Sequence, residues 1–90
     1  MYYGLRMTKP GSRLSALLVA ECAKRDLTYK DASVLLGQSE NAVSRWVSMA
    51  VAPSPDVWPA IAEFLGITEV EVATALALDR IAVREARRSL

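Results

Sequence analysis

The sequence predicts an all-α fold, a compact five-helix domain with an extended C-terminal helix. Three observations support this prediction. No strand-like alternation of apolar and polar residues persists over a useful length, apolar residues recur at helical spacing, and helix start and stop residues recur along the chain. Ninety residues, of which 52% are hydrophobic, suffice for one modest core.

The first helix is expected to open at Ser12 or Arg13, because Pro10-Gly11 breaks any earlier helix. Its apolar stripe occupies positions i, i+3, i+4 and i+8, and consists of Leu14, Leu17, Leu18 and Cys22.

The second helix is expected to start after Thr28, with Asp31 completing an acidic version of a capping box. Gly37 supplies its left-handed stop. Its expected buried face consists of Ala32, Leu35 and Leu36.

A third helix, expected over 39–49, follows the tight connection Gly37-Gln38 and is capped by Ser39. Its expected apolar stripe consists of Val43, Trp46, Val47 and Ala50.

The prolines of the segment 51–55 predict a loop before the fourth helix. Ser54 and Asp56 are alternative caps, and Asp56 is preferred because it keeps Pro59 in the first helical turn. Gly66 is expected to end this helix. Its inward residues are expected to be Trp58, Ile61, Ala62 and Leu65.

Thr68 and Glu71 form a capping box for a fifth helix that runs toward Leu90. Its apolar residues exceed what one small core needs, so part of them is expected either to pair with a second subunit or to fold back over the first and fourth helices. Arg84, Arg87 and Arg88 suit the helix dipole and need no DNA contact to explain them. These apolar residues are Val72, Leu76, Leu78, Ile81, Val83 and Leu90.

Composition argues against an enzyme and against a metal or cofactor. The chain has no histidine, its one cysteine, Cys22, has no base partner, and it has neither a metal-ligand cluster nor a phosphate-binding glycine loop. No small-molecule ligand is expected. No apolar run reaches the ~18 residues of a membrane span, and the N-terminus lacks the apolar core of a secretory signal, so a cytoplasmic protein is expected.

The third helix has two chemically different sides. Opposite its apolar stripe lie residues that form hydrogen bonds, rather than the usual mixture of Lys and Glu. A short helix, a glycine-containing turn and a second helix that exposes such residues make a helix-turn-helix arrangement. The second helix of this arrangement can enter the DNA major groove. The polar residues are Glu40, Asn41, Ser44, Arg45 and Ser48.

The segment from Leu27 to Thr68 resembles the Cro/C1-type (XRE) helix-turn-helix family of phage and bacterial repressors. The resemblance implies a DNA-binding domain over 12–76 that acts as a homodimer on a two-fold double-stranded DNA operator in the bacterial cytoplasm. The matching residues are Leu27-Thr28, Leu36-Gly37, Ser39, Val43-Ser44-Arg45-Trp46, Pro53, Ile61-Ala62 and Leu65-Gly66-Ile67.

The same resemblance assigns roles to individual residues. Glu40 and Asn41 lie where the family's recognition helix first meets bases, and Ser44 and Arg45 lie one turn later. Arginine matches the acceptors of guanine, and asparagine matches the edge of adenine. Glu40 either accepts from cytosine or only favours the helix N-terminus. The full expected DNA-binding set is Tyr29, Gln38, Ser39, Glu40, Asn41, Ser44, Arg45 and Ser48, with Tyr29 replacing a glutamine that contacts phosphate.

Three further positions depart from the family pattern. Val47 and Met49 stand where a glutamate and a glycine are common, and Cys22 stands where the arginine that pairs with this glutamate is expected. Replacing both members of a buried ion pair is neutral or stabilising, whereas losing one is costly. We therefore expect Cys22 and Val47 to pack together as an apolar substitute.

The chain is divided into an N-terminal arm (1–11), the helix-turn-helix domain (12–76) and a C-terminal helical extension (77–90) expected to mediate dimerisation. Three alternatives stay open for the arm, which is expected to be disordered, to contact DNA or to precede the true start at Met7. The preferred function is a transcriptional regulator. The alternative is a protein-interaction module of the same fold, such as an antitoxin or a regulator-binding subunit, which the net charge of only +1 favours.

Overall fold

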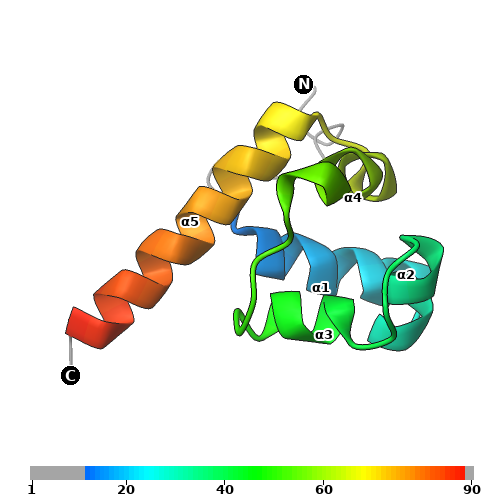
Figure 1. Cartoon of the computed structure of the whole chain (residues 1–90), viewed down its shortest axis with the longest axis horizontal. Helices are drawn as coiled ribbons and strands as arrows, with labels where there is room; N and C mark the ends of the chain where they lie inside the picture. The colour runs from blue at the N-terminus through cyan, green and yellow to red at the C-terminus, as the bar shows by residue number, and fades with distance from the viewer. Residues whose placement is uncertain (1–11, 89–90) are drawn as a thin grey trace.

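The computed structural model describes residues 12–88, and within them it is all-α (Figure 1). Helix α1 is central and packs against α3, α4 and α5, while α2 packs against α3 and α4 against α5. The expected N-terminal arm and Leu90 lie outside the described residues. Within 12–88 no helix is long and apolar enough to cross a membrane. The elements are α1 (Leu14–Arg25), α2 (Tyr29–Leu35), α3 (Ala42–Val47), the 3-10 turn η2 (Pro55–Val57), α4 (Trp58–Leu65) and α5 (Glu69–Arg88).

The caps that depend on neighbouring residues are confirmed. Thr28 and Asp31 exchange the two hydrogen bonds of a capping box at the start of α2. Thr68 and Glu71 do the same at the start of α5. Each pair satisfies two N–H groups that a helix start leaves without partners.

Both predicted glycine stops are also confirmed. Gly37 and Gly66 have φ of 72° and 71°, a conformation that side chains disfavour. The turn after α2 and the end of α4 therefore have a backbone reason for their glycines.

The core gathers one side of each helix. Leu14, Leu18 and Cys22 of α1 are buried, as predicted, while Leu17 is half-buried against them. The remaining buried apolar residues are Ala32, Leu36, Val43, Trp46, Val57, Ile61, Ala62, Phe64, Leu65, Val72, Ala75 and Leu76. The core thus holds α1 against α3, α4 and α5.

The predicted buried face of α2 is wrong at Leu35, whose exposure is 64%. Ser33 is buried in its place, beside Ala32 and Leu36. The buried arc of α2 is centred on these three residues because α3 packs on the Ser33 side. A residue at position 35 falls outside that arc.

Helix α3 is shorter than the predicted helix 39–49. A turn precedes it, in which the N–H of Ala42 donates to the carbonyl of Ser39, and no side chain caps it from Asn41. Ser39 is therefore not its cap. At the other end Met49 adopts a φ of 64°, so the chain leaves the helix and Ala50 is exposed rather than part of the stripe.

The start of α4 combines the two predicted alternatives. Ser54 precedes η2, its hydroxyl donates to the carboxylate of Asp56 at 2.5 Å, and α4 itself begins at Trp58. Pro59 lies within the first turn of α4, as required, but Asp56 is not its cap. Pro55 lies at the start of η2 and Pro59 in the first turn of α4. Both positions tolerate proline because the first N–H groups of a helix have no acceptor within the helix.

Two long-range contacts fix α1 at its ends. The buried carboxylate of Asp79 in α5 accepts hydrogen bonds from the backbone N–H of Ser15 at 3.0 Å and from its hydroxyl at 2.8 Å. At the other end Arg25 donates to the carbonyl of Phe64 and lies over that ring, 4.4 Å from its centroid. The first contact ties α5 to α1, and the second ties α4 to it.

Candidate nucleic-acid interface

The relative position of α2 and α3 depends on one buried hydroxyl. The Oγ of Ser33 donates to the carbonyl of Tyr29 at 2.7 Å and accepts from the N–H of Val43 at 3.0 Å. Val43 is the second residue of α3, where a capping side chain would ordinarily act. Ser33 therefore caps α3 from the neighbouring helix and holds the two helices at a fixed angle.

The side of α3 opposite the core is exposed and polar. Val43 and Trp46 are buried and anchor α3, whereas the predicted reading residues Asn41, Ser44 and Arg45 are exposed. A rigidly anchored helix thus presents hydrogen-bonding side chains outward.

The side chains of Asn41 and Arg45 have no hydrogen-bond or ion-pair partner among residues 12–88. Asn41 immediately precedes α3 and Arg45 lies within it, and the N–H of Arg45 donates to the carbonyl of Asn41 at 3.1 Å, so the two residues are one turn apart. Ser44 and Ser48 are occupied, because their hydroxyls donate to the carbonyls of Asn41 and Arg45. Arg45 and Asn41 therefore have the most hydrogen-bonding capacity left for a ligand.

Glu40 is the acidic member of the predicted set. Its carboxylate lies 3.8 Å from the ammonium of Lys30, and both side chains are about two-thirds exposed. An exposed pair of this kind contributes little to stability. It places a lysine of α2 beside the start of α3 and partly offsets the negative charge there.

The other predicted residues surround the turn. Tyr29 opens α2 and is half-buried against the core, and Ser39 is exposed. The amide of Gln38 donates to the carbonyl of Leu36 at 3.4 Å. All eight predicted residues thus belong to α2, the turn or α3 and its C-terminal end.

Cys22 and Val47 belong to the same core. Cys22 is buried, Val47 is half-buried against the core, and their helices α1 and α3 are packed together. Their direct pairing stays a prediction. Burial raises the pKa of the Cys22 thiol, and the nearby carboxylate of Glu21 raises it further, against an opposing effect of Arg25.

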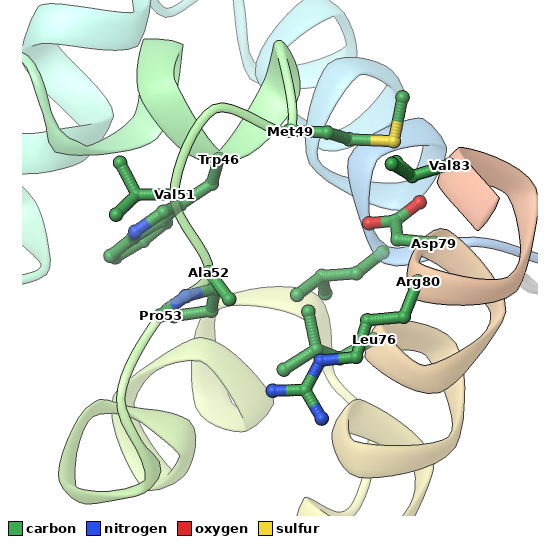
Figure 2. Close-up of a pocket in the computed structure, with 10 residues that line it drawn as sticks. Trp46, Met49, Val51, Ala52, Pro53, Leu76, Asp79, Arg80 and Val83 are labelled. Carbon is green, nitrogen blue, oxygen red and sulfur yellow. The ribbon is translucent and has the colours of Figure 1, made fainter. Parts of the chain in front are cut away.

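A separate pocket of about 190 Å³ lies between the C-terminal end of α3, the following loop and α5 (Figure 2). Its lining is mainly apolar and includes Trp46, Met49, Leu76 and Val83. The side chain of Met49 points across the pocket toward Val83 of α5. The pocket therefore lies where the C-terminal end of α3 comes close to α5. Among the described residues no group of three or more side chains is placed to hold a metal ion.

Helices α2 and α3 are short, are joined by a turn that contains Gly37, and are connected by the buried hydrogen bonds of Ser33. The second of them exposes a polar side. This arrangement defines a helix-turn-helix protein of the DNA-binding regulator class. The family comparison agrees, since the helix-turn-helix family HTH_3 matches residues 19–72. The chain belongs to this family, the Cro/C1-type group that its sequence resembles. Searches of the curated proteins and of the solved structures found no match.

The sequence pattern predicts neither the contact that Ser33 makes between α2 and α3 nor the contact that Asp79 makes between α5 and α1. Ser33 has no predicted role because it lies next to the predicted apolar stripe of α2. Asp79 is separated from Ser15 by 64 positions, and no local pattern connects them. A serine within an otherwise apolar arc, as at position 33, is the one available signal of a buried polar contact.

Proposed function

We propose that this protein is a sequence-specific transcriptional regulator of the phage Cro or immunity-repressor type, which reads a double-stranded DNA operator through α3. The observation that carries the proposal is the pair Asn41 and Arg45. Both side chains are exposed and have no partner in the described chain, and they stand one turn apart at the start of α3 and within it. Because α3 is anchored in the core, a ligand that binds these side chains does not have to order the helix backbone as well.

Base readout is assigned first to Arg45 and Asn41. The guanidinium of Arg45 fits O6 and N7 of guanine, and the amide of Asn41 fits N6 and N7 of adenine. Ser44 and Ser48 can each accept one further hydrogen bond, because their hydroxyl protons are already donated. Glu40 accepts from cytosine N4 in this arrangement, with Lys30 limiting its repulsion from phosphate.

Backbone positioning is assigned to the residues around the turn. Tyr29, Gln38 and Ser39 carry groups that bind phosphate oxygens, and such contacts fix register without reading sequence. Lys30, exposed at the base of α3, joins this group by position. The proposed interface therefore has two parts. Helix α3 reads the bases, and the residues around the turn bind the phosphate backbone of the DNA.

We also propose that the protein acts as a homodimer through the C-terminal extension 77–90. Ile81 is 45% exposed, and Leu78 is only half-buried on α5. Helix α5 continues without a break to Arg88, so this part of the extension is continuous with the domain. A two-fold pair of recognition helices would read two half-sites about 34–36 Å apart.

Selection of bound duplexes from a random pool, followed by titration at low and physiological salt, tests the proposed function. We expect enrichment of one two-fold symmetric motif and an affinity that falls steeply with salt, because released counterions contribute to binding. Absence of both an enriched motif and low-salt binding would refute the proposal.

One observation favours the alternative of a protein-interaction module. Val34 and Leu35, adjacent on α2, are 60% and 64% exposed. Neighbouring exposed apolar residues next to a recognition helix suit a protein contact. The selection experiment separates the two functions, since an interaction module of this kind enriches no DNA motif.

A further inference from the structure

The C-terminal half of α5 extends beyond the rest of the domain. Asp79 is the last buried residue of α5, yet the helix continues to Arg88. In Figure 1 these orange and red turns project past the other helices and reach the edge of the molecule along which α3 lies. This part of the helix is therefore available to whatever α3 binds.

The projecting half is strongly basic. Among residues 80–88 four are arginines and one, Glu85, is acidic, whereas the first turn of α5 carries Glu69 and Glu71. The arginines are exposed, and none forms an ion pair within residues 12–88. They are Arg80, Arg84, Arg87 and Arg88.

Helix stability does not account for this cluster. The helix dipole acts within the last turn, so it explains Arg87 and Arg88 but not Arg84. Arg84 and Arg88 stand at i and i+4, where two like charges destabilise a helix. The expectation that the helix dipole explains all three arginines therefore fails for Arg84.

The cluster starts on the side of α5 that faces the end of α3. Arg80 and Val83 line the pocket together with Met49, the second residue after α3, and Met49 points toward Val83 (Figure 2). Arg87 lies one helical turn beyond Val83 on the same side. Arg84 lies one helical turn beyond Arg80, which lines the pocket, and Arg88 lies one turn beyond Arg84, so the basic side of α5 is continuous with the α3 side of the domain.

We propose that Arg84, Arg87 and Arg88 form a second DNA contact, which binds the phosphate backbone beside the groove that α3 enters. This inference rests on the proposed function. Three clustered guanidinium groups match phosphate oxygens and carry no base-reading geometry of their own, so the contact adds affinity independent of sequence. On the opposite side of α5 lie Leu78 and Ala82, which leaves that side to the proposed dimer contact.

The salt dependence of DNA binding by the full chain tests the contact. Fluorescence anisotropy would compare the wild type with the triple variant Arg84→Gln, Arg87→Gln and Arg88→Gln on a labelled duplex of mixed sequence, over a series of KCl concentrations. Each phosphate contact contributes about 0.9 to the slope of log K against log salt, so the triple variant is expected to lose about 2 to 3 from its magnitude.

Two controls accompany this variant. Lysine at the same three positions preserves the charge and is expected to keep most of the slope. Lys24→Gln removes one exposed charge at the far end of α1 and is expected to change the slope by less than about 1. Sedimentation and circular dichroism would verify that all variants keep the wild-type mass and helix content.

An unchanged slope for the glutamine variant, with wild-type DNA binding intact, would overturn this inference alone. A wild-type protein that binds no duplex at low salt would instead overturn the proposed function, and this inference with it.

Discussion

The carboxylate of Asp79, within α5, caps the first turn of α1 through the backbone N–H and hydroxyl of Ser15. Arg13, the residue before α1, provides no capping side chain, and its guanidinium lies 3.9 Å from the same carboxylate. A negative charge at a helix N-terminus is stabilised by the helix dipole. The long helix α5 is thus fastened to the central helix by a buried, charge-assisted contact.

Removing this contact is expected to destabilise the domain. Asp79→Ala leaves the N–H and hydroxyl of Ser15 buried without an acceptor, and should lower the free energy of unfolding by about 2–4 kcal/mol. Urea denaturation of Asp79→Ala, Ser15→Ala and the double variant forms a thermodynamic cycle. A coupling energy below about 0.5 kcal/mol would show that the two side chains act independently.

The buried hydroxyl of Ser33 is expected to matter for both stability and DNA binding. Ser33→Ala leaves the N–H of Val43 unsatisfied, which should cost about 1–3 kcal/mol. Without the hydrogen bonds of Ser33, the position of α3 relative to α2 is less fixed, so the affinity for a selected DNA duplex should fall. Thr74→Ala serves as the control, since it removes an exposed hydroxyl that bonds only within its own helix. Equal stability losses in the two variants would contradict the role of Ser33.

Met49 holds a position that favours glycine. Its φ of 64° follows α3, where the N–H of Ala50 reaches back to the carbonyl of Arg45. Met49→Gly relieves the strained conformation but loses packing in the pocket, whereas Met49→Ala loses the packing alone. The glycine variant should therefore be more stable than the alanine variant by about 1 kcal/mol. Thermal unfolding would compare them, and a more stable alanine variant would refute the assignment.

The raised pKa of Cys22 predicts a loss of stability at high pH. Above the ordinary thiol pKa of 9.0 the unfolded chain releases the proton while the buried thiol keeps it, so unfolding becomes more favourable as pH rises. This contribution is fully present below 9.0 and disappears as pH rises through the folded-state pKa.

Comparison with Cys22→Ala isolates the effect from other groups that titrate in the same range. Urea denaturation on both sides of pH 9.0 should show a steeper decline in the wild type than in the variant. Parallel declines would show that the thiol has the same pKa in both states.

Local chemistry explains what the sequence could predict. The capping pair Thr28 and Asp31 and the stop Gly37 depend on neighbours within a few residues, so their patterns were sufficient. The polar side of α3 can also be predicted from the sequence, because the apolar residues Val43 and Trp46 identify the opposite, buried side.

Tertiary contacts explain what it could not. Leu35 is exposed because Ser33, rather than a leucine, faces α3. Ser39 does not cap α3 because Ser33 supplies that hydrogen bond from another helix. The cap of α1 comes from Asp79, and no periodic pattern relates residues so far apart. In each case a contact with another helix, rather than the neighbouring sequence, determines which residue is buried or caps a helix.

The central claim is that α3 reads base sequence, and the binding preference of Arg45→Ala tests it most directly. After selection of the preferred operator, the wild type and the variant would be titrated against that duplex, against each single base-pair change and against a scrambled duplex. Loss of one bidentate contact should remove about 1–3 kcal/mol of discrimination, or about 5- to 150-fold, at one base pair of each half-site. A variant that keeps the full wild-type preference at every base pair would contradict the account.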